Sequence, residues 1–217
     1  LDPMSTDTQP LVVCFGEVLW DFLPDALYPG GAPFNVAYHL SRHGCSVHLV
    51  SAVGTDALGE ELRRRVTAWG LEPSGLRRQP HKPTGYVRAQ LSAEGAPAYD
   101  IARNVAWDGI EPGGRSLSAT RKASAFVFGS LAQRTSANQQ SLDQLLAELP
   151  ETALRVFDVN LRPPHIDRTL LRRLARKASM IKLNSAEAAY LAGSDDEKPG
   201  HEERNARALF ALNGCRS

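Results

Sequence analysis

The sequence contains few cysteines. Its three cysteines, Cys14, Cys45 and Cys215, lie far apart, and none belongs to a C-x-x-C pair. This pattern argues against a zinc ribbon and against a disulfide framework. Cys14 lies within an apolar run and is predicted to be a buried thiol, so a reduced, cytoplasmic setting is expected.

The sequence also lacks an excess of one charge, and it has few aromatic residues and no long apolar run. Its 25 Lys and Arg residues nearly balance its 24 Asp and Glu residues, whereas nucleic-acid-binding proteins usually show a strong basic excess. Aromatic residues make up only 7% of the chain, too few to predict a platform for stacked bases. No apolar stretch approaches the roughly 18 residues that span a bilayer. We therefore expect neither a nucleic acid nor a membrane as a partner.

Patterns of buried strands and amphipathic helices alternate along most of the chain. Residues 11–15 form a short apolar run ended by Gly16, which is typical of a strand buried on both faces. In residues 58–69 apolar side chains recur along one face of a helix. Further strands are predicted at 47–53, 125–128, 154–159 and 180–183, and further helices at 33–43, 142–149, 170–178, 185–192 and 202–213. The alternation predicts a doubly wound, mostly parallel α/β sheet with helices on both faces and ligands beyond the carboxyl ends of its strands.

Residues 72–120 interrupt this alternation. They are rich in proline and glycine, and they contain two short β-like pieces at 84–91 and 98–103. We predict an antiparallel excursion there rather than a part of the main sheet.

The two ends of the sequence carry separate expectations. Leu1, Asp2 and Pro3 precede Met4, so residues 1–10 are expected to be a tag remnant and an N-terminal tail, ahead of one α/β domain at 11–217. The sequence ends at Ser217, shortly after a predicted helix, where the alternation requires a strand, so the C-terminal part of the fold is expected to be absent. A partial sequence, a cleaved protein and a truncated homologue that binds without catalysis all remain open.

Two glycines, Gly30 and Gly31, precede the helix that is predicted to begin at Pro33. Glycine lets the backbone approach a ligand closely, and the first turn of a helix points free N–H groups toward it. Asn35 offers both a donor and an acceptor, which suits a sugar hydroxyl. The same residues also fit a plain turn followed by a helix with proline at its first position.

An acidic residue, Asp21, follows the first predicted strand at a short distance. Such a residue lies near the ligand edge of a parallel sheet, where its carboxylate can accept hydrogen bonds from two hydroxyls. An aspartate in a solvated loop is the alternative interpretation.

Five short motifs in a fixed order connect these residues. They are G-E-V-L-W-D-x-x-P at 16–24, G-G-A-P-F-N-V-A at 30–37, V-G-T-D-A-L-G at 53–59, D-V-N-L-R at 158–162 and K-L-N-S-A-E at 182–187. Together they resemble the N-terminal signature of ribokinase-like carbohydrate kinases, the pfkB family, and within it fructokinases more than ribokinases or adenosine kinases. The resemblance implies a ribokinase-like fold with a small β lid, formed by about residues 18–29 and 84–103, that would exclude water from the sugar.

The resemblance also implies a division of roles among candidate site residues. The sugar would be bound by Asp21, Gly30, Gly31, Asn35, Arg103, Asp158 and Asn160. ATP would be bound by Lys182, Asn184 and Glu187, with Glu187 holding Mg²⁺ through water. From the residues alone, Asn184 to Glu187 also fits a helix capping box, Asp158 a partner for the loop at 162–164, and Arg103 an ordinary surface arginine.

One part of the family pattern does not occur in the sequence. The second signature of the family resembles D-T-x-G-A-G-D, whose glycines would stabilise the transferred phosphoryl group and whose last Asp would act as the base. Without that run, no catalytic residue is expected in this chain, and the base and the anion hole are expected beyond Ser217.

The resemblance implies an ATP-dependent sugar kinase acting on a hexose, with fructose as the expected sugar. An exposed lid could pair with that of a second copy as a homodimer. A truncated, inactive sugar-binding homologue and a kinase for another sugar or nucleoside are the alternatives.

Overall fold

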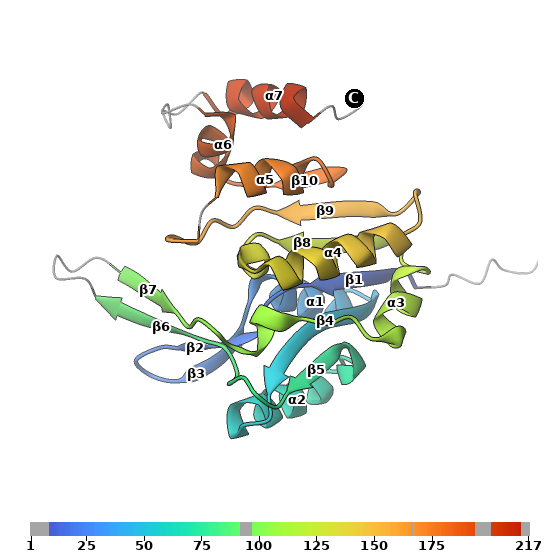
Figure 1. The fold of residues 1–217 in the computed structure, drawn as a ribbon, viewed down its shortest axis with the longest axis vertical. Helices are drawn as coiled ribbons and strands as arrows, with labels where there is room; N and C mark the ends of the chain where they lie inside the picture. The colour runs from blue at the N-terminus through green and yellow to red at the C-terminus, as the bar shows by residue number, and fades with distance from the viewer. Residues whose placement is uncertain (1–8, 92–96, 166, 194–200, 214–217) are drawn as a thin grey trace, which may run out of the picture.

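The computed structural model describes residues 9–91, 97–165, 167–193 and 201–213. Its main sheet has six strands in the order β10-β9-β8-β1-β4-β5, and every neighbouring pair is parallel (Figure 1). The strands are β1 (Leu11–Phe15), β4 (Ser46–Gly54), β5 (Leu76–Gln79), β8 (Ala125–Gly129), β9 (Leu154–Asp158) and β10 (Met180–Lys182). The predicted parallel sheet is therefore confirmed.

Strand β1 lies in the middle of the sheet because both of its faces are apolar. Val13 and Phe15 point into one hydrophobic cluster, while Val12 and Cys14 point into the other. Alternate side chains of a strand face opposite sides of a sheet, so a continuous apolar run can be buried only between two layers. The run at residues 11–15 thus predicts both its strand and its central position.

Helices cover both faces of the main sheet, as the doubly wound fold requires. They are α1 (Ala32–Arg42), α2 (Ala57–Ala68), α3 (Gly114–Thr120), α4 (Ser136–Glu148), α5 (Arg168–Ala175), α6 (Ser185–Ala192) and α7 (Glu202–Asn213). Phe34 of α1 and Leu62 of α2 pack in the cluster with Cys14. Leu142 of α4 and Leu171 of α5 pack in the cluster on the other face. Among the described residues, no helix is long and apolar enough to cross a membrane.

A second sheet of four strands, in the order β3-β2-β6-β7, lies to one side of the main sheet (Figure 1). It consists of β2 (Leu19–Phe22), β3 (Leu27–Gly30), β6 (Tyr86–Leu91) and β7 (Pro97–Ile101). Strands β2 and β6 pair in parallel, and each is flanked by an antiparallel partner. These strands come from the two segments expected to form a lid; residues 92–96 of the second segment lie outside the described residues.

The prediction for residues 72–120 is wrong in part. Strand β5 pairs in parallel with β4 and forms an edge of the main sheet, and α3 follows further along the chain. Only Leu76 of the four residues L-R-R-Q in β5 is buried, so this edge strand gives no apolar run. Helix α3 buries the polar residues Ser116 and Thr120, whose hydroxyls bond to His48 and to a backbone carbonyl. Its apolar periodicity is consequently too weak to recognise.

The expected N-terminal tail and the last residues fall largely outside the described part of the chain. Of residues 1–10, the structure describes only Gln9 and Pro10, which are exposed and precede β1. Cys215 and Ser217 lie in the undescribed range 214–217. The structure therefore gives an environment only for Cys14 and Cys45, which carry free thiols, and the expectation of a base and an anion hole beyond Ser217 lies outside the described residues.

Candidate functional site

The hairpin of β2 and β3 brings Asp21 next to the glycine pair. Asp21 pairs with Tyr28 across the hairpin, and its carboxylate lies so close to Gly30 that a β-carbon there would collide with Oδ2. Asp21 is partly buried, and this burial raises the pKa of its carboxyl group, while Arg162 nearby lowers it. The sequence places Asp21 and Gly30 in separate motifs; the strand pairing makes them neighbours.

Gly31 ends this hairpin and begins α1. Its φ of +110° is accessible mainly to glycine, and a β-carbon would also collide with the backbone carbonyl of Glu17. The sequence predicted that the helix begins at Pro33. It begins one residue earlier, at Ala32, so Pro33 is its second residue. Asn35 lies in the first turn, exposed, and among the described residues its side chain has no hydrogen-bond partner. Gly31 and Asn35 therefore border a helix start that is open to a ligand.

Glu17 is the residue of this site to which the sequence assigned no role. Glu17 is 2% exposed, and its carboxylate accepts a hydrogen bond of 3.2 Å from the Ala32 N–H at the start of α1. The other carboxylate oxygen is buried without a partner among the described residues. Burial raises the pKa of Glu17 to about 7, the N–H groups and Arg162 lower it, and Asp158 raises it. The position of Glu17 directly after Gly16 in the first motif was the available signal.

The raised pKa of Glu17 predicts a pH-dependent stability that Glu17→Gln should remove. Between its ordinary pKa of 4.5 and about 7, the folded protein holds a proton that the unfolded chain releases. The free energy of unfolding therefore falls as pH rises through this window, by roughly 3 kcal/mol at most. Gln keeps the acceptor for Ala32 but cannot ionise, so urea unfolding from pH 4.5 to 8 should show wild type losing more stability than the variant. Parallel curves would contradict the prediction.

At the carboxyl end of β9, Asp158 pairs with Lys182 of the neighbouring strand. The parallel register sets these two residues side by side, and Lys182 Nζ lies 3.0 Å from Asp158 Oδ1. Asn160 follows with a positive φ of 41°, and its carbonyl accepts a hydrogen bond from Ser130. A β-carbon at Gly129 would meet both the Asp158 carbonyl oxygen at 3.6 Å and Pro33 Cγ at 3.9 Å, so the end of β9 lies near the first turn of α1.

The capping box predicted at Asn184 and Glu187 is confirmed. Asn184 Oδ1 accepts from the Glu187 N–H at 2.8 Å, and Glu187 Oε2 accepts from the Asn184 N–H at 2.9 Å. The second carboxylate oxygen of Glu187 accepts from the Leu161 N–H at 2.8 Å, so this side chain also joins α6 to the loop after β9. Glu187 is 6% exposed.

The residues present fit a hydrated Mg²⁺ better than a directly chelated one. Mg²⁺ in proteins commonly keeps several waters and binds one or two carboxylates together with substrate phosphates. Within the described residues, no three His, Cys, Asp or Glu side chains gather as a metal-ligand set. Both oxygens of Glu187 already accept backbone N–H groups, but each keeps a further lone pair for a water molecule.

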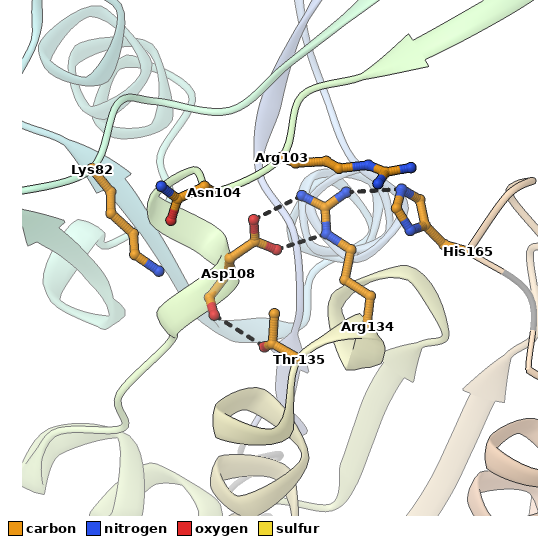
Figure 2. Close-up of a pocket in the computed structure, with 7 residues that line it drawn as sticks. All are labelled: Lys82, Arg103, Asn104, Asp108, Arg134, Thr135 and His165. Atoms are coloured by element: carbon orange, nitrogen blue, oxygen red, sulfur yellow. Dashed lines mark hydrogen bonds and ion pairs between the residues drawn. The ribbon is translucent and has the colours of Figure 1, made fainter.

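Arg103 follows β7 and lines a separate pocket of about 420 Å³. We call this the basic pocket; its lining residues are Lys82, Arg103, Asn104, Asp108, Arg134, Thr135 and His165 (Figure 2). None of the other predicted sugar contacts lines it. The structure thus groups four predicted sugar contacts at the start of α1, namely Asp21, Gly30, Gly31 and Asn35. Arg103 lies instead among the residues of the basic pocket.

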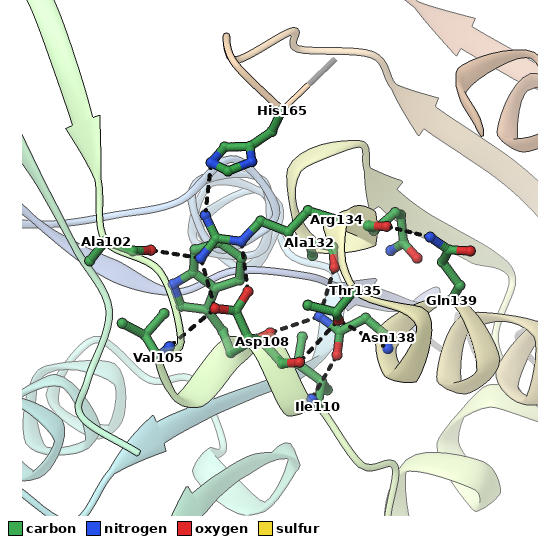
Figure 3. A network of polar contacts seen from close by, with 12 residues as sticks. Ala102, Val105, Asp108, Ile110, Ala132, Arg134, Thr135, Asn138, Gln139 and His165 are labelled. Atoms are coloured by element: carbon green, nitrogen blue, oxygen red, sulfur yellow. Dashed lines mark hydrogen bonds and ion pairs between the residues drawn. The ribbon is translucent and has the colours of Figure 1, made fainter. Parts of the chain in front are cut away.

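The wall of the basic pocket is a buried ion pair between Arg134 and Asp108. Arg134 Nε and Nη2 lie 2.7 and 2.8 Å from the two oxygens of Asp108, and both side chains are at most 8% exposed (Figure 3). Nη2 also donates to the Ala102 carbonyl at 2.6 Å, and the guanidinium stacks 3.9 Å from the ring centre of Trp107. Asn138 Nδ2 bonds to the carbonyls of Trp107 and Ala132 beneath the pair. No pattern in the sequence indicates this network.

The fold and the site together define a class of protein. The ribokinase-like resemblance implies a doubly wound sheet, a second sheet beside it and a helix that begins directly after a glycine pair. The structure has this architecture. The sequence profile of the pfkB family of carbohydrate kinases matches residues 11–213, and the chain belongs to this family.

Several relatives named as fructokinases match most of the chain. Fructokinase of Solanum tuberosum is 29% identical over 205 residues, which cover 88% of this chain and 63% of that protein. A protein named probable fructokinase-6, chloroplastic, of Arabidopsis thaliana is 28% identical over 225 residues, covering 95% of this chain and 58% of that protein. The chain spans 58% to 65% of the length of the Arabidopsis fructokinases that it matches.

Solved structures support the same assignment. The sugar kinase PH1459 of Pyrococcus horikoshii is 26% identical and superposes with a TM-score of 0.73, covering 84% of this chain and 66% of that one. Fructokinase of Xylella fastidiosa superposes with a TM-score of 0.78 at 22% identity, covering 94% of this chain and 67% of that one. At this lower identity the likeness shows the fold. A ribokinase-like fold is therefore confirmed.

Proposed function

We propose that this chain belongs to an ATP-dependent sugar kinase that transfers the γ-phosphoryl group of MgATP to a hydroxyl of a hexose, with fructose as the sugar. The observation that carries the proposal is the arrangement at the start of α1. There, the Asp21 carboxylate lies against Gly30, Gly31 takes a backbone conformation suited to glycine, and the Asn35 side chain is exposed without a protein partner among the described residues. Fructokinases among the relatives support the choice of sugar.

Each sugar contact follows from the chemistry of its group. A carboxylate such as Asp21 accepts hydrogen bonds from two adjacent hydroxyls, and the Asn35 amide both donates and accepts. Gly31 lets the sugar approach the first N–H groups of α1. Asp158 contributes from the end of β9, and Asn160 contributes from the loop that follows. The second sheet serves as the lid that keeps water from the phosphoryl group.

ATP is proposed to bind beyond the carboxyl end of β10, where Lys182, Asn184 and Glu187 lie. Solved structures of the Pyrococcus horikoshii sugar kinase and the Xylella fastidiosa fructokinase contain ATP. Bound Mg²⁺ would supply positive charge to the phosphate oxygens, and Glu187 would hold it through water. No D-T-x-G-A-G-D run occurs in the sequence, so neither the base nor the anion hole is assigned to a residue up to Ser217.

Asp21→Asn tests the proposed sugar site. The variant keeps the shape of the side chain and removes its charge, so two charge-assisted hydrogen bonds to the sugar are lost. We therefore expect the affinity for fructose, measured by calorimetry, to fall about 100-fold. Asp25→Asn is the matched control, because Asp25 is an exposed carboxylate in the same hairpin. Fructose binding that both variants reduce equally, or that wild type lacks at millimolar concentration, would refute the assignment.

The alternatives have their own readouts. A full-length protein that binds fructose without releasing ADP from ATP is a sugar-binding homologue. A nucleoside kinase would instead bind a purine nucleoside in competition with fructose.

The oligomeric state and the cellular compartment of the protein are also proposals. The second sheet exposes Leu27, Tyr28 and Tyr99, the last with 61% of its surface accessible, and this apolar surface supports a homodimer paired through the lid. The free thiols of Cys14 and Cys45 support a reduced, cytoplasmic setting.

A further inference from the structure

The basic pocket contains two cations without an acidic partner. Among the described residues, neither Lys82 nor Arg103 forms an ion pair or hydrogen bond with an acidic side chain, although both line the same pocket. The third cation, Arg134, is neutralised by Asp108. The pocket therefore keeps the positive charge of Lys82 and Arg103, and Figure 2 shows these two side chains reaching it from separate segments.

The carboxylate of Asp108 does not neutralise these two cations. Its oxygens accept from Arg134 at 2.7 and 2.8 Å, and Oδ2 also accepts from the Val105 N–H at 3.1 Å. The Ala102 carbonyl and the Trp107 ring hold Arg134 in turn. One wall of the basic pocket is thus fixed before any ligand arrives, which lowers the entropy cost of binding.

His165 adds a donor rather than an acceptor. Its Nε2 lies 3.3 Å from Nη1 of Arg134, and because a guanidinium can only donate, Nε2 must accept. The proton of the neutral imidazole then lies on Nδ1. Burial, Arg134 and Arg103 all lower the pKa of His165, while Asp108 raises it, so the ring stays neutral at physiological pH.

The remaining lining group, Asn104, also offers N–H donors. Its backbone has a positive φ of 54°, and its side-chain amide has no hydrogen-bond partner among the described residues. The free groups of the pocket are thus two cations, an amide and an imidazole N–H. Such a set of donors with excess positive charge matches the oxygens of a phosphate or carboxylate.

We propose that the basic pocket binds an oxyanion, the phosphate or carboxylate group of a small molecule. Its volume of about 420 Å³ lies in the range of small-molecule sites, so it accommodates more than a single ion. Two sources share this chemistry: an anionic substituent on the sugar itself, or a separate phosphorylated molecule. The loop after β9 connects the two places, because Arg162 influences the pKa of Asp21 while His165 lines the pocket.

Lys82→Gln is the test, because Lys82 has no role in the proposed sugar site. Calorimetry with inorganic phosphate on the full chain should show one binding site. Lys82→Gln removes one charge-assisted contact, so it should weaken the affinity of this site for phosphate about tenfold. Lys122→Gln is the matched control, since Lys122 is an exposed cation outside the pocket. Binding of phosphate should also raise the pKa of His165 in an NMR titration, which a structural role of Lys82 would not change.

The outcomes separate this inference from the proposed function. Absence of phosphate binding at millimolar concentration, or equal losses in the Lys82 and Lys122 variants, overturns the oxyanion site whatever the result with fructose. Phosphate that binds equally with and without saturating fructose identifies a separate phosphorylated molecule. Fructose 1-phosphate that binds more tightly than fructose, through both Lys82 and Asp21, identifies a substituent on the sugar.

Discussion

Asp108→Ala is expected to lower the free energy of unfolding by about 3–5 kcal/mol, the usual cost of leaving one member of a buried ion pair alone. Arg134 would keep its charge in a site only 8% exposed, with the Ala102 carbonyl and the Trp107 ring as its remaining close partners besides His165. The loss should appear as a lower midpoint in urea unfolding monitored by circular dichroism.

Asp143→Ala provides the control for this experiment. Asp143 forms an ion pair of 2.8 Å with Lys177, but its side chain is 54% exposed, so the expected loss is below about 1 kcal/mol. A double variant, Asp108→Leu with Arg134→Leu, should be less destabilised than Asp108→Ala, because it leaves no buried charge unpaired. Similar losses for Asp108→Ala and Asp143→Ala would show that the buried pair contributes no more than a surface pair.

Gly31→Ala should cost roughly 3 kcal/mol of stability and eliminate fructose binding, through strain of the positive φ together with a steric collision. Any β-carbon at this position meets the carbonyl oxygen of Glu17, a backbone atom that cannot rotate away. Relief of the collision requires a shift of the segment that carries Glu17 or of the first turn of α1. Because Asn35 lies in that turn, the sugar contacts are displaced with it.

Gly44→Ala gives the cost of a positive φ without a collision. Gly44 has a positive φ of 85°, yet a β-carbon there would meet nothing within 4 Å. Its replacement should therefore cost only the backbone strain, about 1 kcal/mol. The difference between the two variants, measured by urea unfolding, combines the collision at Gly31 with the larger backbone strain of its φ of 110° and ψ of 128°, a region that residues with a β-carbon avoid. If the two losses agree, the tight approach between Gly31 and Glu17 has no energetic role.

Local patterns predicted the main sheet well, because burial on both faces imposes a continuous apolar run that needs no tertiary information. The run in β1 is an example, and the face of α2 was predicted in the same local way from its helical period. Strand β5 was not predicted because an edge strand buries little, and its two arginines are exposed. Helix α3 was not predicted because its buried residues include hydroxyl groups that form hydrogen bonds in place of apolar contacts.

In the candidate site, too, local features could be predicted from the sequence and contacts between distant segments could not. The capping box of Asn184 and Glu187 could be predicted because its partners are three residues apart. The bond from Leu161 to Glu187 could not, since only the parallel pairing of β9 and β10 brings these segments together. The basic pocket has no sequence pattern at all: Lys82, Arg103 and His165 come from three separate loops, and Arg134 ends the short 3-10 helix Leu131–Arg134.

The path of the chain through the second sheet constrains the order of folding. Trp20 of β2 pairs with Tyr86 of β6, and the chain between them forms α1, β4, α2 and β5. Closing so long a loop is entropically costly while that segment is disordered, but it costs little once the main sheet has placed both ends. The pairing of β2 with β6 should therefore form after the main sheet, whereas the hairpin of β2 and β3 that brings Asp21 to Gly30 is local and requires no such loop to close.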